Sequence, residues 1–301
     1  MKIGLIGLGK MGFHLALNLR DHGHEVVGFD LSDQARKRLE EENVATASDL
    51  PALLAALPAP KVLWMMVPSG QATEASIQEA KALLSEGDIL IDAGNSNYKD
   101  SMRHGAELAA QGIRFLDVGT SGGMSGARNG ACLMIGGDPS AYEYLEEAFQ
   151  DVAVEKGCVY TGKAGSGHFM KMVHNGIEYG MMQAIGEGFQ IMRESPFDYD
   201  LADVAENWNH GSVIRGWLMA LAEEQFRAHP DLSDLRGVVA ASGEAKWTVE
   251  AALELGIAAP TIALSLFMRN LSQEEDSFSA KVVAALRNGF GGHAMVKKED
   301  A

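Results

Sequence analysis

Four polar side chains recur at helical spacing within one mostly apolar segment, residues 167–182. Their offsets of three, four and seven residues along the chain place them on one face of a helix. A helix that is apolar nearly all round is normally buried, and polar side chains on it are costly unless they face a polar cavity. The pattern predicts a face that performs chemistry, with an ordinary solvent-exposed polar face as the alternative. The four residues are Lys171, His174, Asn175 and Glu178.

Two of these side chains could transfer protons. A lysine that is desolvated in a site can lose its proton near neutral pH and act as a base. A glutamate in a site can have its pKa raised and act as an acid. A base at Lys171 and an acid at Glu178, about two helical turns further on, could therefore act on the two ends of one small substrate.

The residues near the N-terminus form a G-x-G-x-x-G motif between an expected strand and an expected helix. In that context the first glycine permits a tight turn, the second lets the backbone approach a pyrophosphate, and the third lets helix and strand pack closely. The helix would direct its free N–H groups at the phosphates. A glycine-rich turn without a ligand is the alternative. The motif comprises Gly7, Leu8, Gly9, Lys10, Met11 and Gly12.

An acidic residue follows the second expected strand. Asp30 lies 18 residues after Gly12 (30 − 12), where a carboxylate hydrogen-bonds the ribose hydroxyls of an adenosine. A 2′-phosphate here would meet that negative charge and the one on Asp33. No Lys or Arg occurs before Arg36, so we expect no cation beside Asp30. The motif therefore predicts NAD rather than NADP, with a simple turn or helix-capping role for Asp30 as the alternative.

Short apolar runs alternate with helical patterns through the first half of the chain, which is typical of a parallel, doubly wound sheet. We expect strands at 2–6, 25–30, 61–67, 89–92, 114–118, 131–135 and 152–155, with helices at 11–21, 32–42 and 98–111 among them. From residue 168 onward we find helical patterns, at 169–193, 201–208, 217–228, 246–255, 261–271 and 274–286. The prediction is an α/β Rossmann-type, NAD-binding domain at 1–164. An all-α C-terminal domain at 165–301 would bind substrate and form oligomers.

The composition limits the possible partners. The 301-residue chain has a formal net charge of −16, which disfavours nucleic acid and anionic membranes as partners. An anionic substrate would therefore need a positive site built from a few basic residues. No stretch approaches the ~20 apolar residues of a membrane span, so we expect a cytoplasmic protein. Two cysteines, Cys132 and Cys158, cannot form a zinc pattern, and we expect free thiols and no metal.

At these motifs the sequence resembles the 6-phosphogluconate dehydrogenase family. The run KMVHNGIEY at 171–179 is similar to that family's catalytic helix almost residue for residue. Further similar segments are DAGNS at 92–96, TSGG at 120–123, GAR at 126–128, Gly243 with KWT at 246–248, Arg269, and RNGFGGH at 287–293. The chain resembles the short form of the family, with one copy of the helical domain. It departs from the family pattern at Ala93, in the loop 67–70, which lacks a lysine, and at 124–125.

The resemblance implies oxidative decarboxylation of 6-phospho-D-gluconate to D-ribulose 5-phosphate and CO₂, a step of pentose phosphate or gluconate metabolism. Lys171 would be the base for the C3 hydroxyl and Glu178 the acid that protonates C1, with His174 and Asn175 beside them. The resemblance implies cofactor contacts from the glycine motif and from Asp30, Val67, Pro68, Ser69 and Asn95. It implies substrate contacts from Asn95, Ser121, Gly122, Gly123, His174, Asn175, Tyr179, Lys246, Arg269, Arg287 and His293. In the family the last two often come from a neighbouring subunit, so a homo-oligomer of two or four subunits is implied.

Two other functions are open. A related NAD-dependent β-hydroxyacid dehydrogenase would oxidise its substrate without decarboxylation and would need neither Glu178 nor three phosphate-binding cations. A non-enzymatic NAD-sensing protein would keep the glycine motif and lose the face that carries Lys171 and Glu178. Both residues are present, which favours the decarboxylating enzyme.

Overall fold

The computed structural model describes residues 1–297, and residues 298–301 lie outside the described part of the chain. Two compact units are present, Met1–Gly176 and the part that begins at Ile177. The domain limits expected from the sequence, 1–164 and 165–301, stay a prediction, and the last four residues of the second domain lie outside the described range.

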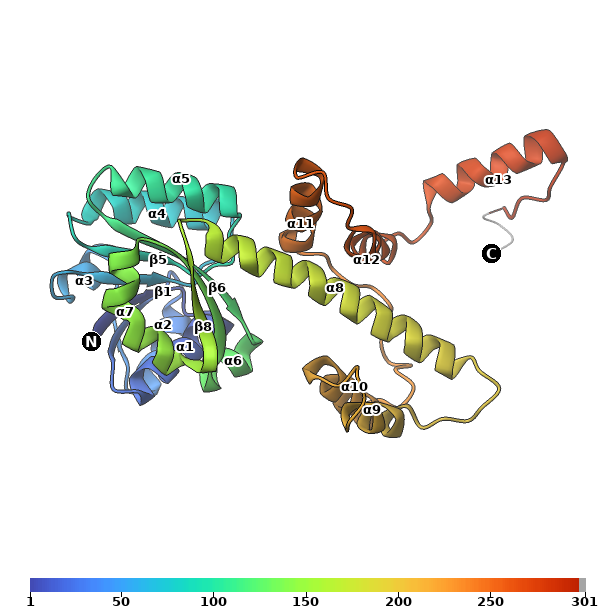
Figure 1. Ribbon diagram of the computed structural model, residues 1–301, viewed down its shortest axis with the longest axis horizontal. Coiled ribbons are helices and arrows are strands. Elements are labelled where there is room, and N and C mark those ends of the chain that lie inside the picture. The colour runs from blue at the N-terminus through green and yellow to red at the C-terminus, as the bar shows by residue number, and fades with distance from the viewer. Residues whose placement is uncertain (298–301) are drawn as a thin grey trace. The chain divides into compact units, whose positions relative to one another are not determined.

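The first unit is built around one eight-stranded sheet, which Figure 1 draws in blue to green. The strand order is β3-β2-β1-β4-β5-β6-β7-β8, and neighbours are parallel except for β6 and β7. The order changes direction at β1, and ligands bind at such a switch point, outside the carboxyl ends of the strands. The strands are β1 Lys2–Ile6, β2 Glu25–Phe29, β3 Ala45–Thr46, β4 Val62–Met65, β5 Ile89–Asp92, β6 Arg114–Ser121, β7 Ala131–Gly137 and β8 Ala153–Gly162.

Helices cover both faces of this sheet, each face with its own apolar cluster (Figure 1). One cluster includes Leu19 of α1 and Phe149 of α7, and the other includes Leu53 of α3 and Ile77 of α4. The central strands β4 and β5 are buried along their whole length, which explains their continuous apolar sequences. The helices are α1 Lys10–Asp21, α2 Asp33–Glu41, α3 Leu50–Ala55, α4 Gln71–Leu83, α5 Tyr98–Ala109, α6 Gly123–Asn129 and α7 Pro139–Val152.

The second unit is helical, and its boundary with the first falls within α8. Tyr179, Ala245 and Leu266 form one small apolar cluster, and Phe189, Ala205 and Met219 begin another. By contrast, α13 has no buried residue. The helices are α8 Ser166–Arg193, α9 Leu201–Asn209, α10 Trp217–Ala228, α11 Gly243–Glu254, α12 Pro260–Leu271 and α13 Phe278–Gly291. A Rossmann-type sheet followed by these helices confirms the predicted fold class.

Several elements differ from the sequence prediction. The strand β3 and the helices α6 and α7 were not predicted, and β3 is too short to show a periodicity. The helices α3 and α4 lie between predicted strands, where helical stretches were expected without bounds. The last strand, β8, continues well past the expected 152–155. Its full length could not be predicted, because β8 is an edge strand with mostly exposed or half-buried residues and therefore has no continuous apolar run. The last helix begins at Phe278, after Ser277 at the N-cap, rather than at 274.

Cys132 and Cys158 are free thiols, as expected. No helix in the described range is long and apolar enough to cross a membrane.

Candidate active site

The glycine motif lies where β1 passes into α1. A Cβ atom on Gly7, whose φ is 88°, would lie 2.6 Å from the carbonyl oxygen of Met66. A Cβ on Gly12 would lie 1.8 Å from the carbonyl oxygen of Gly7, so both positions require glycine. Gly9 faces open space instead, with no described atom within 4 Å of a Cβ placed there. Because α1 begins at the next residue, Lys10, phosphate groups have an open approach to its N-terminus.

Asp30 follows β2, and its carboxylate accepts two backbone hydrogen bonds. The N–H of Leu8 donates to Oδ2 at 2.7 Å, and the N–H of Ser32 donates to Oδ1 at 2.8 Å. These bonds hold the carboxylate beside the glycine motif. The expectation that no cation lies here is wrong, because the first turn of α2 brings Arg36 back to the loop. Its guanidinium donates to the backbone oxygen of Asp30 and forms an ion pair with Asp33, so its charge is already paired.

A pocket of about 690 Å³ extends from the glycine motif across the carboxyl ends of the central strands. Two of the expected cofactor residues do not line it: the side chain of Leu8 is buried in the core, and Ser69 is exposed in the loop before α4. The expected cofactor residues that do line it are Gly7, Gly9, Lys10, Met11, Gly12, Asp30, Val67, Pro68 and Asn95.

Asn95 connects two of the strand ends at this pocket. The residue adopts a left-handed conformation with φ of 54°, and its Oδ1 accepts a hydrogen bond of 3.2 Å from the N–H of Thr120 in β6. Thr120 lines the same pocket and precedes Ser121 in the chain. The loop after β5 is therefore tied to the end of β6, where the expected substrate loop begins.

The start of α8 is fixed to β6 by a buried carboxylate. Asp117 is fully buried, and it accepts hydrogen bonds from the N–H of Gly165 at 2.6 Å and of His168 at 2.8 Å. Gly119, two residues later in β6, allows close packing, since a Cβ there would lie 2.3 Å from the Cβ of Lys171. Neither Asp117 nor Gly119 was predicted from the sequence. An acid inside an otherwise apolar strand was the available signal, because a buried carboxylate needs partners.

A chain of hydrogen bonds joins the predicted catalytic face of α8 to β6. Lys171, only 6 % exposed, donates from Nζ to Oδ1 of Asn175 at 2.8 Å. Nδ1 of His174 lies 2.9 Å from the same oxygen, and Nε2 of His174 lies 3.2 Å from Oγ of Ser121. An amide oxygen only accepts, so Nδ1 carries the proton, and in the neutral ring Nε2 accepts from the serine hydroxyl. The structure thus brings together Lys171, His174, Asn175 and Ser121.

Gly122 and Gly123 follow Ser121 at the start of α6. Both have positive φ values, 119° and 60°. A Cβ on Gly122 would lie 2.9 Å from the Cα of Gly126, whereas Gly123 faces open space among the described atoms. The turn that they form needs glycine, and it leads directly into the N-terminus of α6.

Tyr179 organises the expected phosphate site within the helical unit. The ring is 4 % exposed, its hydroxyl lies 2.9 Å from Oγ of Ser242, and it accepts the N–H of Ser242 at 2.9 Å. The guanidinium of Arg269 lies 3.3 Å from the ring centroid, and its Nη1 donates to the backbone oxygen of Ala240 at 3.3 Å. Tyr179 and Arg269 are therefore brought together as a cation–π pair.

The remaining expected site residues are less enclosed. Lys246 is exposed on α11 with its Nζ 3.6 Å from a carboxylate oxygen of Glu250. Glu178 is half-buried on α8. Arg287 and His293 are exposed, one on α13 and one just after it. For Arg287 and His293, the described residues show no bond to Lys246 or Arg269.

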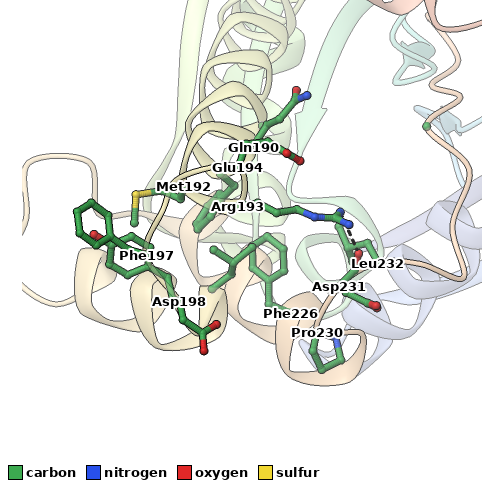
Figure 2. A pocket seen from close by; sticks show the side chains of 15 residues that line it. Gln190, Met192, Arg193, Glu194, Phe197, Asp198, Phe226, Pro230, Asp231 and Leu232 are labelled. Atoms are coloured by element: carbon green, nitrogen blue, oxygen red, sulfur yellow. Dashed lines mark hydrogen bonds between the residues drawn. The ribbon is translucent and has the colours of Figure 1, made fainter.

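A second cavity, of about 680 Å³, lies in the helical unit (Figure 2). Phe197 and Phe226 line it together with Arg193, whose Nη1 donates to the backbone oxygen of Asp231 at 3.3 Å. Its lining includes no residue that the sequence analysis singled out.

The fold, the glycine motif and the family models define the class: the chain is an oxidoreductase whose Rossmann domain binds a nicotinamide dinucleotide. Residues 2–162 match the model of the NAD binding domain of 6-phosphogluconate dehydrogenase, and residues 167–300 match the model of its C-terminal domain. The chain belongs to the 6-phosphogluconate dehydrogenase family.

Individual relatives support this assignment. A Bacillus subtilis protein provisionally named as a 6-phosphogluconate dehydrogenase is 53% identical over 99% of this chain and 100% of its own length. An NAD(+)-dependent, decarboxylating 6-phosphogluconate dehydrogenase of Haloferax volcanii is 42% identical over 100% of both chains. The Plasmodium falciparum 6-phosphogluconate dehydrogenase, solved with its cofactor NADP+ and with its substrate 6-phosphogluconate, superposes with a TM-score of 0.83 at 30% identity. It covers 100% of this chain, which spans 67% of the Plasmodium chain.

Proposed function

We propose that the chain oxidises and decarboxylates 6-phospho-D-gluconate to D-ribulose 5-phosphate and CO₂, with NAD as the hydride acceptor. The observation that carries this proposal is the hydrogen-bonded group of Lys171, Asn175, His174 and Ser121, which the structure joins to the end of β6. The names of the Haloferax and Plasmodium relatives support the same substrate and reaction.

The cofactor site fits a dinucleotide. Open space at Gly9 leaves room for a pyrophosphate at the N-terminus of α1, and Asp30 is held where it would bind the ribose hydroxyls. When bound, the nicotinamide accepts a hydride. The Haloferax relative is named for NAD and the Plasmodium relative was solved with NADP. The carboxylate of Asp30 favours NAD here. Two guanidinium groups lie near it: that of Arg36 is already paired with Asp33, and that of Arg38 donates to the backbone oxygen of Leu8 at 3.2 Å.

In the proposed mechanism Lys171 acts first as a base. Its uncharged amine removes the proton of the C3 hydroxyl while the hydrogen on C3 leaves as hydride. The product is a β-keto acid, which loses CO₂, because the ketone receives the electron pair of the breaking C–C bond. Lys171, now protonated, donates to the ketone oxygen and stabilises the enediolate. Glu178 then protonates C1 to give ribulose 5-phosphate.

The substrate would be held at both charged ends. We assign the carboxylate to Ser121 and the N–H groups of Gly122 and Gly123, with His174 positioned by its bonds to Ser121 and Asn175. The phosphate would be bound by charge-assisted hydrogen bonds from basic residues. On a chain with a net charge of −16 these cations would have to be gathered locally. The assigned phosphate residues are Lys246, Arg269, Arg287, Tyr179 and His293.

Arg287 and His293 would act in a neighbouring subunit. No residue of α13 is buried within the chain, although Phe278, Leu286 and Phe290 are large and apolar. Such a helix gains stability when it packs against a partner. The proposed assembly is therefore a homo-oligomer in which α13 carries these two residues to the partner's substrate.

The deciding experiment is an assay with 6-phosphogluconate and each of NAD and NADP, in which reduced cofactor and CO₂ are followed together. We expect both products in equal amounts, with NAD preferred. Reduced cofactor without CO₂ would indicate the non-decarboxylating β-hydroxyacid dehydrogenase instead.

A further inference from the structure

One face of α4 lines the dinucleotide pocket. Ala72, Ala75, Ser76 and Glu79 all border it, and their offsets of three, four and seven residues place them on one side of the helix. Ile77, on another side, is buried in the core and fixes the rotation of α4. The pocket-facing side therefore presents three small side chains followed by one carboxylate.

The two ends of the pocket differ in their surroundings. Asn95 and Thr120 border one end, next to Ser121 and the hydrogen bonds that lead to Lys171. Asp30 and the next residue in the chain, Leu31, border the other end, and the side chain of Leu31 is 90 % exposed. If the reactive ring lies toward Asn95, the base attached to the ribose at Asp30 must lie toward Leu31 and α4.

Glu79 is the carboxylate of α4 that can bind a ligand. The other acid of the helix, Glu74, is already bonded to Arg103 at 2.6 Å and His104 at 2.8 Å. Glu79 is exposed, and its carboxylate forms no hydrogen bond or ion pair with any other residue in the range 1–297. A carboxylate that borders a pocket without a protein partner has its acceptor capacity available to a ligand.

We propose that Glu79 recognises the base of the dinucleotide by accepting a hydrogen bond from the 6-amino group of adenine. This inference rests on the proposed binding of NAD. Adenine offers an amino donor on one edge, and a carboxylate only accepts, so the two are complementary. The flat ring packs between Leu31 and the small side chains of Ala72 and Ala75. Glu79 is thus a specificity-determining residue at the cofactor end of the site.

The test compares the binding of NAD with that of nicotinamide purine dinucleotide, which has hydrogen in place of the 6-amino group. Calorimetric titration gives both dissociation constants without any turnover. The unmodified chain should bind NAD about tenfold more tightly, the lower end of the range for a hydrogen bond to a charged group. Glu79→Met should bind both dinucleotides equally, whereas Glu79→Gln, which keeps an acceptor oxygen, should retain part of the preference.

Glu86→Met is the matched control, because Glu86 is also exposed but does not border the pocket. It should keep the full preference. Equal binding of the two dinucleotides by the unmodified chain would overturn the role of Glu79 and leave the proposed function intact. An unchanged preference in Glu79→Met would do the same. If the unmodified chain fails to bind NAD at all, the cofactor proposal falls together with this one.

Discussion

The amine of Lys171 and the amide oxygen of Asn175 lie 2.8 Å apart on successive turns of α8. The same oxygen also accepts a hydrogen bond from Nδ1–H of His174. One acceptor atom therefore orients both the proposed base and the ring that bonds Ser121. A change at Asn175 would therefore affect both groups together.

Removal of the Lys171 amine should strongly slow hydride transfer. Lys171→Met keeps a side chain of similar length without the base, and the rate of cofactor reduction should fall by roughly 10²–10⁴-fold, the usual effect of a general base. Calorimetric binding of NAD should persist, because Lys171 does not border the dinucleotide pocket. The control is Lys163→Met, at an exposed lysine. Near-normal turnover of Lys171→Met would remove Lys171 as the base.

Glu178 should matter after CO₂ has left. Glu178→Gln preserves shape and removes the acid, so steady-state turnover should fall by roughly 10²–10⁴-fold. A first turnover of cofactor reduction should still appear as a burst in stopped-flow absorbance, since hydride transfer precedes protonation of C1. Glu187→Gln changes an exposed glutamate on the same helix and serves as the control. Loss of the burst together with turnover would contradict this order of steps.

The cofactor preference should reverse when the charge at the end of β2 is reversed. Asp30→Asn combined with Leu31→Arg removes the carboxylate and adds a guanidinium at a side chain that is 90 % exposed, so the core is not disturbed. The ratio of kcat/KM for NADP to that for NAD should rise by roughly a hundredfold, the scale of one buried or partly buried charge interaction. Equal efficiencies with both cofactors in the unmodified chain would contradict the role of Asp30.

Mixed oligomers can show which subunit supplies Arg287. Lys171→Met and Arg287→Ala should each be nearly inactive alone. When the two variants are unfolded, mixed in equal amounts and refolded, a dimer with one of each regains one complete site. Recovery of about a quarter of normal activity is expected from random pairing. No recovery, with hetero-oligomers demonstrated by mass spectrometry, would place Arg287 in its own subunit's site.

The acid stability of the chain should depend on Glu74, which joins α4 to α5. Hydrogen bonds from Arg103 and His104 lower the pKa of this carboxyl to about 2. A pKa depressed in the folded state stabilises the fold above the unfolded value of 4.5, and this contribution disappears as the pH falls toward 2. Glu74→Gln should therefore lower the free energy of unfolding at pH 7 by about 1 kcal/mol or less, since exposed ion pairs are screened by solvent.

Urea denaturation at pH 7, 4 and about 2.5 measures this difference between Glu74→Gln and the unmodified chain. The difference in the free energy of unfolding should shrink as the pH falls. Glu86→Gln changes a glutamate outside the group of Glu74, Arg103 and His104, and its free energy of unfolding should equal that of the unmodified chain at each pH. A difference that stays constant with pH would contradict the assignment.

The fold could be predicted wherever the sequence carries a period or a continuous apolar run. The strands at 2–6 and 89–92 lie where they were expected, because parallel strands buried on both faces are apolar throughout. The edge strand β8 could not be recognised in full, since one exposed side leaves no such run. For α4 the sequence predicted a helical stretch between two strands but no bounds, although Thr73, Ile77 and Ala80 mark a buried side.

The sequence alone determined the chemistry that α8 can offer, because helical geometry fixes which of its residues share a face. It also determined the glycine motif, since only glycine tolerates the close approaches at Gly7 and Gly12. Tertiary structure decided what those residues touch. The anchoring of α8 by Asp117, the bond from His174 to Ser121 and the return of Arg36 to Asp30 join residues on different elements. No local spacing encodes such contacts, because they arise only when the sheet brings its strand ends together.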